Sequence, residues 1–251
     1  MDATEVKREV RRRYAAAARE GGCGCGCGQG DCCTPDGDAP LVDYGDLAEA
    51  LVEGSDLGLG CGMPTRFASL QPGEVVLDLG SGAGIDVFLA AKVVGADGYV
   101  IGVDMTPAMI ARAQTNAERA GIKNVDFRLG EIERLPVTDG YVDVILSNCV
   151  INLSPDKPRV FAEMRRVLKP GGRFSVSDIV SLGDVPEEVH KDAGLWASCI
   201  AGAPEKDEYL RLIAEAGFTG VQVYHLEEYD QFRGDGYGFA SLTVGAVKRD
   251  T

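Results

Sequence analysis

A glycine-rich turn is the first segment of this chain whose residue types suit chemistry. The segment GSGAG, at residues 80–84, directly follows an apolar run, VVLDLG, at 75–80. Glycines at such a point let the backbone turn tightly and approach a ligand, with the N–H groups of a following helix facing it. The turn therefore predicts a binding site for a nucleoside-type cofactor.

Acidic residues follow the next two apolar runs. Asp104 ends YVIGVD (99–104), where a carboxylate can accept hydrogen bonds from both hydroxyls of a ribose. Glu131, Ile132 and Glu133 follow the third run, where they could make apolar and polar contacts with an adenine ring. The predicted cofactor-binding residues are Asp78, Gly80, Ser81, Gly82, Gly84, Asp104, Met105, Glu131, Ile132 and Asn148. A nicotinamide dinucleotide is the alternative, but Ile85 stands where its fingerprint requires a third glycine.

The cysteines are the second group of chemically suited residues. Three are isolated: Cys61 in a glycine-flanked loop, Cys149 directly after the fourth apolar run, and Cys199 in an apolar segment after the fifth. Five more crowd into one short stretch, Cys23, Cys25, Cys27, Cys32 and Cys33. Taken singly, an isolated cysteine is most often a small buried hydrophobe. The C-x-C-x-C spacing of the first three clustered cysteines argues against structural zinc.

A soft substrate would explain the isolated thiols together. Thiolates bind soft centres, and trivalent arsenic is a soft centre that is three-coordinate and pyramidal. Its lone pair is the nucleophile, so no general base is needed to create one. This agrees with a chain that has only two histidines, His190 and His225, neither of them in a motif.

The elements that position these residues alternate between strands and helices. Strands are predicted at 75–80, 99–104, 125–130, 142–148, 173–180, 220–226 and 239–248, and helices at 85–95, 107–121, 156–169 and 205–216. Such alternation predicts an α/β fold with a doubly wound, mostly parallel sheet. Residues 4–20 are expected to form a surface helix with Thr4 as its N-cap.

The chain is expected to fall into three parts. Residues 1–40 would hold the N-terminal helix and a mobile Cys/Gly-rich loop, 41–180 the cofactor-binding domain, and 181–251 a substrate-binding insert and the last elements of the sheet. A net charge of −14 disfavours nucleic acid and membrane surfaces as partners. Reduced thiols and the lack of a signal-peptide pattern favour a cytoplasmic protein.

Several segments resemble a known family. Asp78-Leu79-Gly80-Ser81-Gly82 resembles the first motif of class I methyltransferases. LGLGCG (57–62), SNCVINLSPDKP (147–158) and SCIAGA (198–203) resemble arsenite S-adenosylmethionine methyltransferases more specifically. A departure is Met63, where an asparagine is more usual.

The resemblance implies roles for particular residues. Cys149 and Cys199 would bind arsenic directly, with Cys61 as a third thiol paired with Cys33 or Cys32 near the N-terminus. The cofactor would be S-adenosyl-L-methionine, the substrates arsenite and methylated trivalent arsenicals, and the reductant glutathione or a thioredoxin-like protein. A turnover-dependent disulfide between Cys61 and Cys33 or Cys32 is expected, because Cys61 lies in a flexible glycine loop. The alternatives are methylation of an organic substrate such as a quinone and sequestration of a metal by the thiols.

Overall fold

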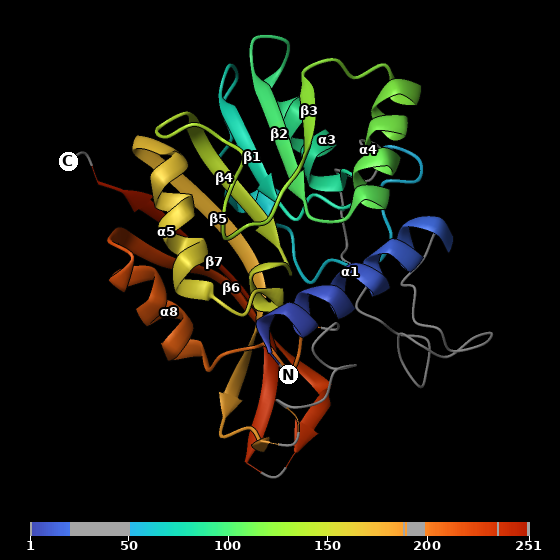
Figure 1. The fold of residues 1–251 in the computed structure, drawn as a ribbon. Coiled ribbons are helices and arrows are strands. Elements are labelled where there is room, and N and C mark those ends of the chain that lie inside the picture. The colour runs from blue at the N-terminus through green and yellow to red at the C-terminus, as the bar shows by residue number, and fades with distance from the viewer. Residues whose placement is uncertain (1, 21–50, 188, 190–198, 235, 250–251) are drawn as a thin grey trace.

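A seven-stranded sheet forms the centre of a computed structural model that describes residues 2–20, 51–187, 189, 199–234 and 236–249. The strands lie in the order β3-β2-β1-β4-β5-β7-β6 (Figure 1). They are β1 (Val75–Leu79), β2 (Tyr99–Asp104), β3 (Val125–Leu129), β4 (Val142–Asn148), β5 (Leu168–Gly183), β6 (Phe218–Gly234) and β7 (Tyr237–Lys248). The helices are α1 (Ala3–Glu20), α2 (Pro64–Phe67), α3 (Ile85–Val94), α4 (Pro107–Ala120), η2 (Ile151–Leu153), α5 (Lys157–Val167) and α8 (Lys206–Glu215).

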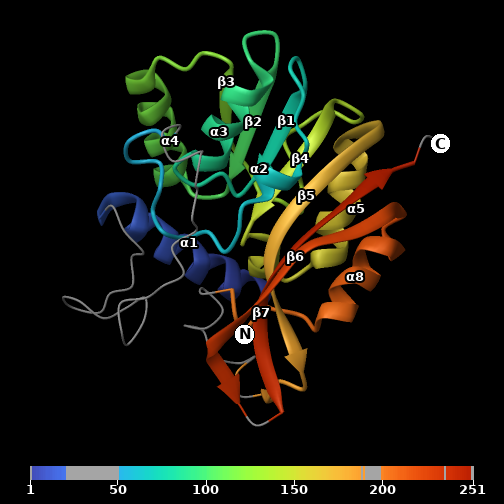
Figure 2. The ribbon, with the colours of Figure 1, turned by 180° about the vertical axis from the view of Figure 1, so that it is seen from behind.

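Helices cover both faces of this sheet, as the strand–helix alternation predicts. β1 to β5 run parallel, and β7 is antiparallel to both of its neighbours. Successive side chains of a strand point to opposite faces. Leu77 therefore packs in a core with Phe161 of α5 and Tyr209 of α8, whereas Val76 packs with Val87 of α3 on the other face. Figures 1 and 2 show these two helical layers from opposite sides. The predicted doubly wound α/β fold is confirmed.

Helix α1 differs from the predicted surface helix, because one of its sides is buried. Val6, Val10 and Ala17 are at most 4% exposed. The helix lies across the end of the sheet at which β1, β2 and β4 finish (Figure 1). Thr4 is not the cap. Asp2 Oδ1 accepts the N–H of Glu5, and Glu5 Oε2 accepts the N–H of Asp2, which is the reciprocal pairing of a capping box.

Several element boundaries differ from those expected. Helix α5 ends at Val167 rather than at 169, since Lys169 precedes Pro170 and a residue before proline disfavours the helical conformation. Strands β5 and β6 are longer than predicted, and β6 pairs with β7 as an extended antiparallel ribbon. This ribbon continues past the end of the parallel strands (Figure 2).

Some expectations fall on residues outside the described part of the chain. These include the clustered cysteines, Cys23, Cys25, Cys27, Cys32 and Cys33, and most of the segment leading to Cys199. The proposed division into 1–40, 41–180 and 181–251 stays a prediction. Within the described part, no helix is long and apolar enough to cross a membrane.

Candidate functional site: a pocket beside a cysteine cluster

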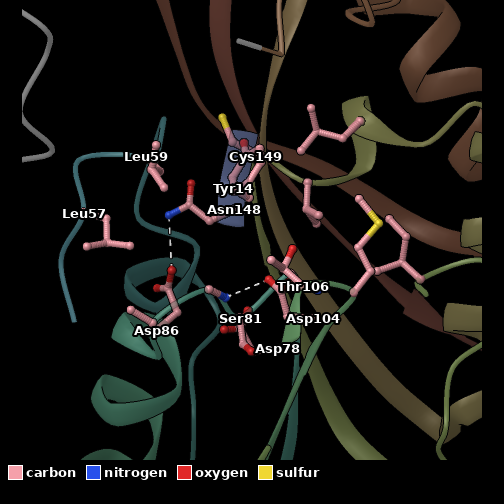
Figure 3. Close-up of a pocket in the computed structure, with 18 of the residues that line it drawn as sticks. Tyr14, Leu57, Leu59, Asp78, Ser81, Asp86, Asp104, Thr106, Asn148 and Cys149 are labelled. Atoms are coloured by element: carbon pink, nitrogen blue, oxygen red, sulfur yellow. Dashed lines mark hydrogen bonds between the residues drawn. The ribbon is translucent and has the colours of Figure 1, made fainter. Parts of the chain in front are cut away.

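A pocket opens where β1, β2 and β4 end, the edge at which ligands bind in doubly wound sheets. Figure 3 shows Asp78, Ser81 and Asp104 on one side of it and Leu57 and Leu59 on another. Most of the predicted cofactor residues line it: Asp78, Gly80, Ser81, Gly82, Asp104, Met105, Ile132 and Asn148. These eight residues therefore lie together, whereas the other two predicted residues, Gly84 and Glu131, lie outside the pocket lining.

Asp104 is held in one orientation by backbone donors. The N–H of Gly82 donates to its Oδ2 over 3.1 Å, and the N–H of Thr106 donates to its Oδ1 over 2.7 Å. Burial raises the pKa of Asp104, while these two hydrogen bonds act to lower it. Each carboxylate oxygen has a further lone pair. Asp104 can therefore still accept hydrogen bonds from a ligand that enters the pocket.

Two more buried carboxylates, Asp78 and Asp86, line the same pocket, and the sequence analysis missed Asp86. Burial, and then the charges of Asp86 and Asp104, raise the pKa of Asp78 well above its usual range. Asp86 accepts hydrogen bonds from the Thr65 hydroxyl (2.7 Å) and the Asn148 amide (3.2 Å). None of the ion pairs formed by the described residues involves Asp78, Asp86 or Asp104. The pocket therefore favours a ligand that carries positive charge.

Gly80 and Gly84 are both needed in the turn, because each has a positive φ and a side chain at either position would collide with a neighbour. Gly80 has a φ of +67°, and a Cβ on it would lie 2.4 Å from a methyl group of Val150. Gly84 has a φ of +100°, and a Cβ there would lie 2.7 Å from the ring of Phe88. Gly84 therefore allows α3 to pack closely against the turn, instead of lining the pocket as predicted.

Glu131 holds α1 in place and does not face the pocket, which differs from its predicted contact with adenine. Lys7 donates to Glu131 over 2.8 Å and lies 3.0 Å from Glu133, and Arg11 also pairs with Glu131. The hydrogen bond from Lys7 is the main reason that the pKa of Glu131 is lowered.

Helix α1 also contributes three pocket residues that sequence reasoning missed, Lys7, Val10 and Tyr14. Their spacing of three and four positions is that of one helix face. This spacing is the signal that could have identified them.

The Gly-Cys-Gly loop is anchored to the sheet, so its predicted flexibility is wrong. The N–H of Cys61 donates to Asn148 Oδ1 (3.0 Å), and Asn148 Nδ2 donates to the carbonyl of Gly62 (2.8 Å). The Ser241 hydroxyl donates to the carbonyl of Cys61 over 2.6 Å. A Cβ on Gly62 would lie 2.6 Å from Ser177, so glycine is needed for this close approach. Asn148 is thus a structural link as well as a pocket residue.

The three isolated cysteines meet at one end of the pocket. Cys61 and Cys149 are joined by a disulfide, and Cys199 is a free, buried thiol. The Cys199 thiol donates to the carbonyl oxygen of Cys149 over 2.9 Å. All three belong to one apolar cluster, and Cys149 also lines the pocket. The expectation that these distant cysteines converge is confirmed.

Cys199 is a neutral thiol in this structure. Burial is the largest cause of the raised pKa of Cys199, and the charge of Asp178 adds to it. With Cys61 and Cys149 oxidised, the described residues contain no group of three or more His, Cys, Asp and Glu side chains placed to hold a metal ion. Three thiols at this point become available together only after the disulfide is reduced.

Comparisons with known proteins agree with this geometry. Residues 70–217 match a family model described as a methyltransferase domain. An arsenite methyltransferase of Halobacterium salinarum is 46% identical over 93% of this chain and 62% of its own length. One of Aquipseudomonas alcaligenes is 45% identical over 64% of this chain and 48% of its own length, so the chain spans about half to two thirds of these relatives.

A solved structure of a related protein has the same fold. It is the crystal structure of an arsenic(III) S-adenosylmethionine methyltransferase from Chlamydomonas reinhardtii. It superposes with a TM-score of 0.69 at 38% identity, over 76% of this chain and 68% of that one.

Proposed function

Because the chain belongs to the arsenic(III) S-adenosylmethionine methyltransferase family, we propose that it methylates trivalent arsenic held by cysteine thiolates, with S-adenosylmethionine as the methyl donor. The observation that carries this proposal is the meeting of Cys61, Cys149 and Cys199 beside a pocket rich in buried carboxylates. Neither feature alone would indicate the reaction. With an organic substrate, the three cysteines would have no role in substrate binding.

The pocket residues suit the proposed cofactor. S-adenosylmethionine carries a ribose, an adenine, an ammonium group and a sulfonium whose methyl group is electrophilic. Asp104 is oriented to accept hydrogen bonds from the ribose hydroxyls, and Ile132 offers an apolar surface to the adenine. Asp78 and Asp86 would offset the positive charges, and a bound cation would in turn relieve the repulsion between these buried carboxylates.

The thiols would hold arsenic with its lone pair directed at the pocket. Each thiol that binds arsenite replaces one hydroxyl: an As–O bond breaks, an As–S bond forms, and the thiol proton leaves with the hydroxyl as water. Holding the two reactants in line is itself worth up to roughly 7–11 kcal/mol of a barrier. Cys149, which lines the pocket and lies beside Cys199, is the best placed of the three ligands.

Methylation uses the arsenic lone pair and leaves the arsenic pentavalent, so two electrons are needed to restore the trivalent form. Two thiols supply them when they become a disulfide. The Cys61–Cys149 disulfide is the oxidised form of such a pair. A pair of Cys61 with Cys33 or Cys32 remains an alternative donor, and both of these residues lie outside the described part of the chain. We propose glutathione or a thioredoxin-like protein in a reducing cytoplasm as the reductant that regenerates the thiols.

The deciding experiment incubates the protein with arsenite, glutathione and S-adenosylmethionine labelled in its methyl group, followed by separation of the arsenic species. Labelled methylarsenicals are expected with the unaltered protein. Cys149→Ser and Cys199→Ser should produce none while still binding S-adenosylhomocysteine, because a hydroxyl is a hard, poorly ionised ligand. If a parallel reaction with a quinone in place of arsenite transferred label to the quinone, with both serine variants fully active, the organic-substrate alternative would be supported.

A further inference from the structure

Asp86 holds the loop between Cys61 and Thr65 at both of its ends. Its Oδ1 accepts the hydroxyl of Thr65, in α2, over 2.7 Å. Its Oδ2 accepts the side-chain amide of Asn148 over 3.2 Å, and Figure 3 marks this contact in the pocket. Asn148 in turn binds the backbone of Cys61 and Gly62. One carboxylate that lines the cofactor pocket therefore reaches the loop by two routes.

The amide of Asn148 satisfies these partners in only one orientation. Its Oδ1 accepts the N–H of Cys61 over 3.0 Å. Its Nδ2 donates to the carbonyl of Gly62 over 2.8 Å and to Asp86, and an ionised carboxylate can only accept. Turning the amide over would set donor against donor at Cys61 and acceptor against acceptor at the other two contacts. Asp86 therefore helps to keep Asn148 in the orientation that binds the loop.

Burial makes the two contacts of Asp86 hard to replace. Asp86 is 3% exposed and Thr65 is 8% exposed. The loop also lies close to Asn148, since a Cβ on Gly60 would come within 3.0 Å of its amide nitrogen. A buried donor that loses its acceptor has no water to turn to, so its loss costs more than that of an exposed one.

Cys61 depends on this anchoring more than the other two cysteines do. The Cys199 thiol contacts Cys149 directly, through the Cys149 carbonyl. Cys61 instead comes from a loop whose backbone is held by Asn148 and Ser241. Once the disulfide is reduced, loss of the anchor should displace Cys61 and leave Cys149 and Cys199 together.

We propose that Asp86 is a positioning residue for Cys61: by fixing Asn148 and Thr65, it keeps this thiol where it serves as the third ligand of arsenic. The inference rests on the proposed function, since it assigns Cys61 to arsenic. Asp86 then belongs to both sites, because its carboxylate lines the cofactor pocket and holds the thiol loop.

The test compares two arsenicals that use different numbers of thiols. Arsenite forms up to three As–S bonds, and each replaces a hydroxyl that leaves as water. Phenylarsine oxide forms only two, with loss of one water, because its As–C bond is kept. In reduced, cofactor-free protein, Asp86→Ala should raise the dissociation constant for arsenite roughly tenfold or more, the order expected when hydrogen bonds to a charged acceptor are lost. The dissociation constant for phenylarsine oxide should stay unchanged, because Cys149 and Cys199 supply both of its ligands.

Two further variants make the comparison specific. Asp78→Ala is the matched control, because Asp78 is a buried carboxylate of the same pocket and the hydrogen bonds described for the loop run to other residues. It should leave the ratio of the two arsenical affinities unchanged. Thr65→Val removes one of the two contacts of Asp86 and keeps the shape of the side chain. It should show the same selective loss at a smaller size.

The outcomes separate the two proposals. An arsenite affinity that is unchanged in Asp86→Ala would overturn the role of Asp86 and leave the proposed function standing. An equal loss for both arsenicals would overturn it as well, since the variant would then disturb the whole site. Should Asp86→Ala lack a melting transition, Thr65→Val decides by the same criteria. If the unaltered, reduced protein binds neither arsenical, the proposed function and this inference fail together.

Discussion

At the scale of single residues, burial and local partners decide what each acidic side chain can do. Asp104 and Asp178 are both buried aspartates, but their partners differ. Asp104 has two backbone N–H donors and faces a pocket, so it is prepared for a ligand. Asp178 is fully enclosed and accepts the hydroxyl of Tyr209 over 2.9 Å, so its ionisation affects the stability of the fold.

We expect Asp104→Ala to weaken binding of S-adenosylhomocysteine ten- to hundredfold. Hydrogen bonds to a charged acceptor are worth about 1.5–3 kcal/mol, and two ribose hydroxyls would lose theirs. Isothermal titration calorimetry measures the change. Asp126→Ala is the control, because Asp126 lies on the edge strand β3 and pairs with Arg128. Equal affinities for both variants would remove Asp104 from the cofactor site.

Asp178 should make the stability of the protein depend on pH near neutrality. Burial raises the pKa of Asp178 to about 7 in the folded state, against 3.8 for an ordinary aspartate. Between these values the folded protein binds more protons than the unfolded one, so the free energy of unfolding falls as pH rises, by up to roughly 1.4 kcal/mol per pH unit. Above pH 7 this contribution levels off.

Asp178→Asn should remove that dependence, since the amide does not titrate. Urea unfolding of both proteins between pH 5.5 and pH 8 would show it: the stability of the unaltered protein relative to the variant is expected to be greatest at pH 5.5 and to fall towards pH 7. A constant difference across this range would mean that Asp178 stays ionised in the folded state. The charge of Lys157, which acts to lower the pKa of Asp178, would be the cause.

At the scale of elements, α1 is the part of the molecule that completes the pocket. Its apolar side packs on the ends of the strands, and its charged side pairs with the segment after β3 through Lys7 and Arg11. The helix supplies Lys7, Val10 and Tyr14 to the pocket lining. Its docking should therefore influence cofactor affinity even though it is far in sequence from the glycine turn.

Lys7→Met is expected to weaken binding of S-adenosylhomocysteine severalfold, because Glu131 and Glu133 would lose their shared cation while the aliphatic stem of residue 7 is kept. Arg12→Met is the matched control: among the residues that the structure describes, Arg12 pairs within α1, with Glu9. Added salt should narrow the difference between the two variants, since it screens partly exposed ion pairs. If Lys7→Met and Arg12→Met bind the cofactor equally well, the contacts of Lys7 do not support the pocket.

At the scale of the whole molecule, the oxidation state of the cysteines determines which sites are available. The Cys61–Cys149 disulfide joins the loop before α2 to the end of β4 and occupies two of the three thiols. The carboxylates of the pocket do not take part in it. Arsenic binding and cofactor binding should therefore respond differently to oxidation.

We expect the oxidised protein to bind S-adenosylhomocysteine but no arsenical, and the reduced protein to bind both. Calorimetry before and after treatment with a phosphine reductant measures this difference. Peptide mapping of protein stalled without reductant then identifies the pair that forms during turnover. A Cys61–Cys149 peptide would identify the pair seen here, and a peptide joining Cys61 to Cys33 or Cys32 would identify the N-terminal thiol instead. If all of these cysteines stayed reduced after turnover, none of them would be the electron donor.

Patterns within short stretches of the sequence were enough to predict the fold and the edge of the sheet at which the pocket lies. Alternating apolar runs and helix signals determine a doubly wound sheet, because each pattern depends on neighbours within a few residues. The turn at 80–84 and Asp104 follow strands of that sheet, and the carboxyl ends of parallel strands lie on one edge. Gly80, Gly82 and Asp104 therefore fell in the pocket as expected.

Only the tertiary structure decided which distant residues meet there. Glu131 was expected to contact the cofactor, but it forms an ion pair with Lys7, which is more than a hundred positions away in sequence. Tyr14 and Asp86 line the pocket because of how α1 and α3 pack, and no motif marks either of them. The anchoring of the Cys61 loop depends on Asn148 and Ser241, which come from two different strands. The spacing of Lys7, Val10 and Tyr14 marks one face of a helix, but no local pattern in the chain indicates which distant element such a face will contact, because that depends on how the elements pack.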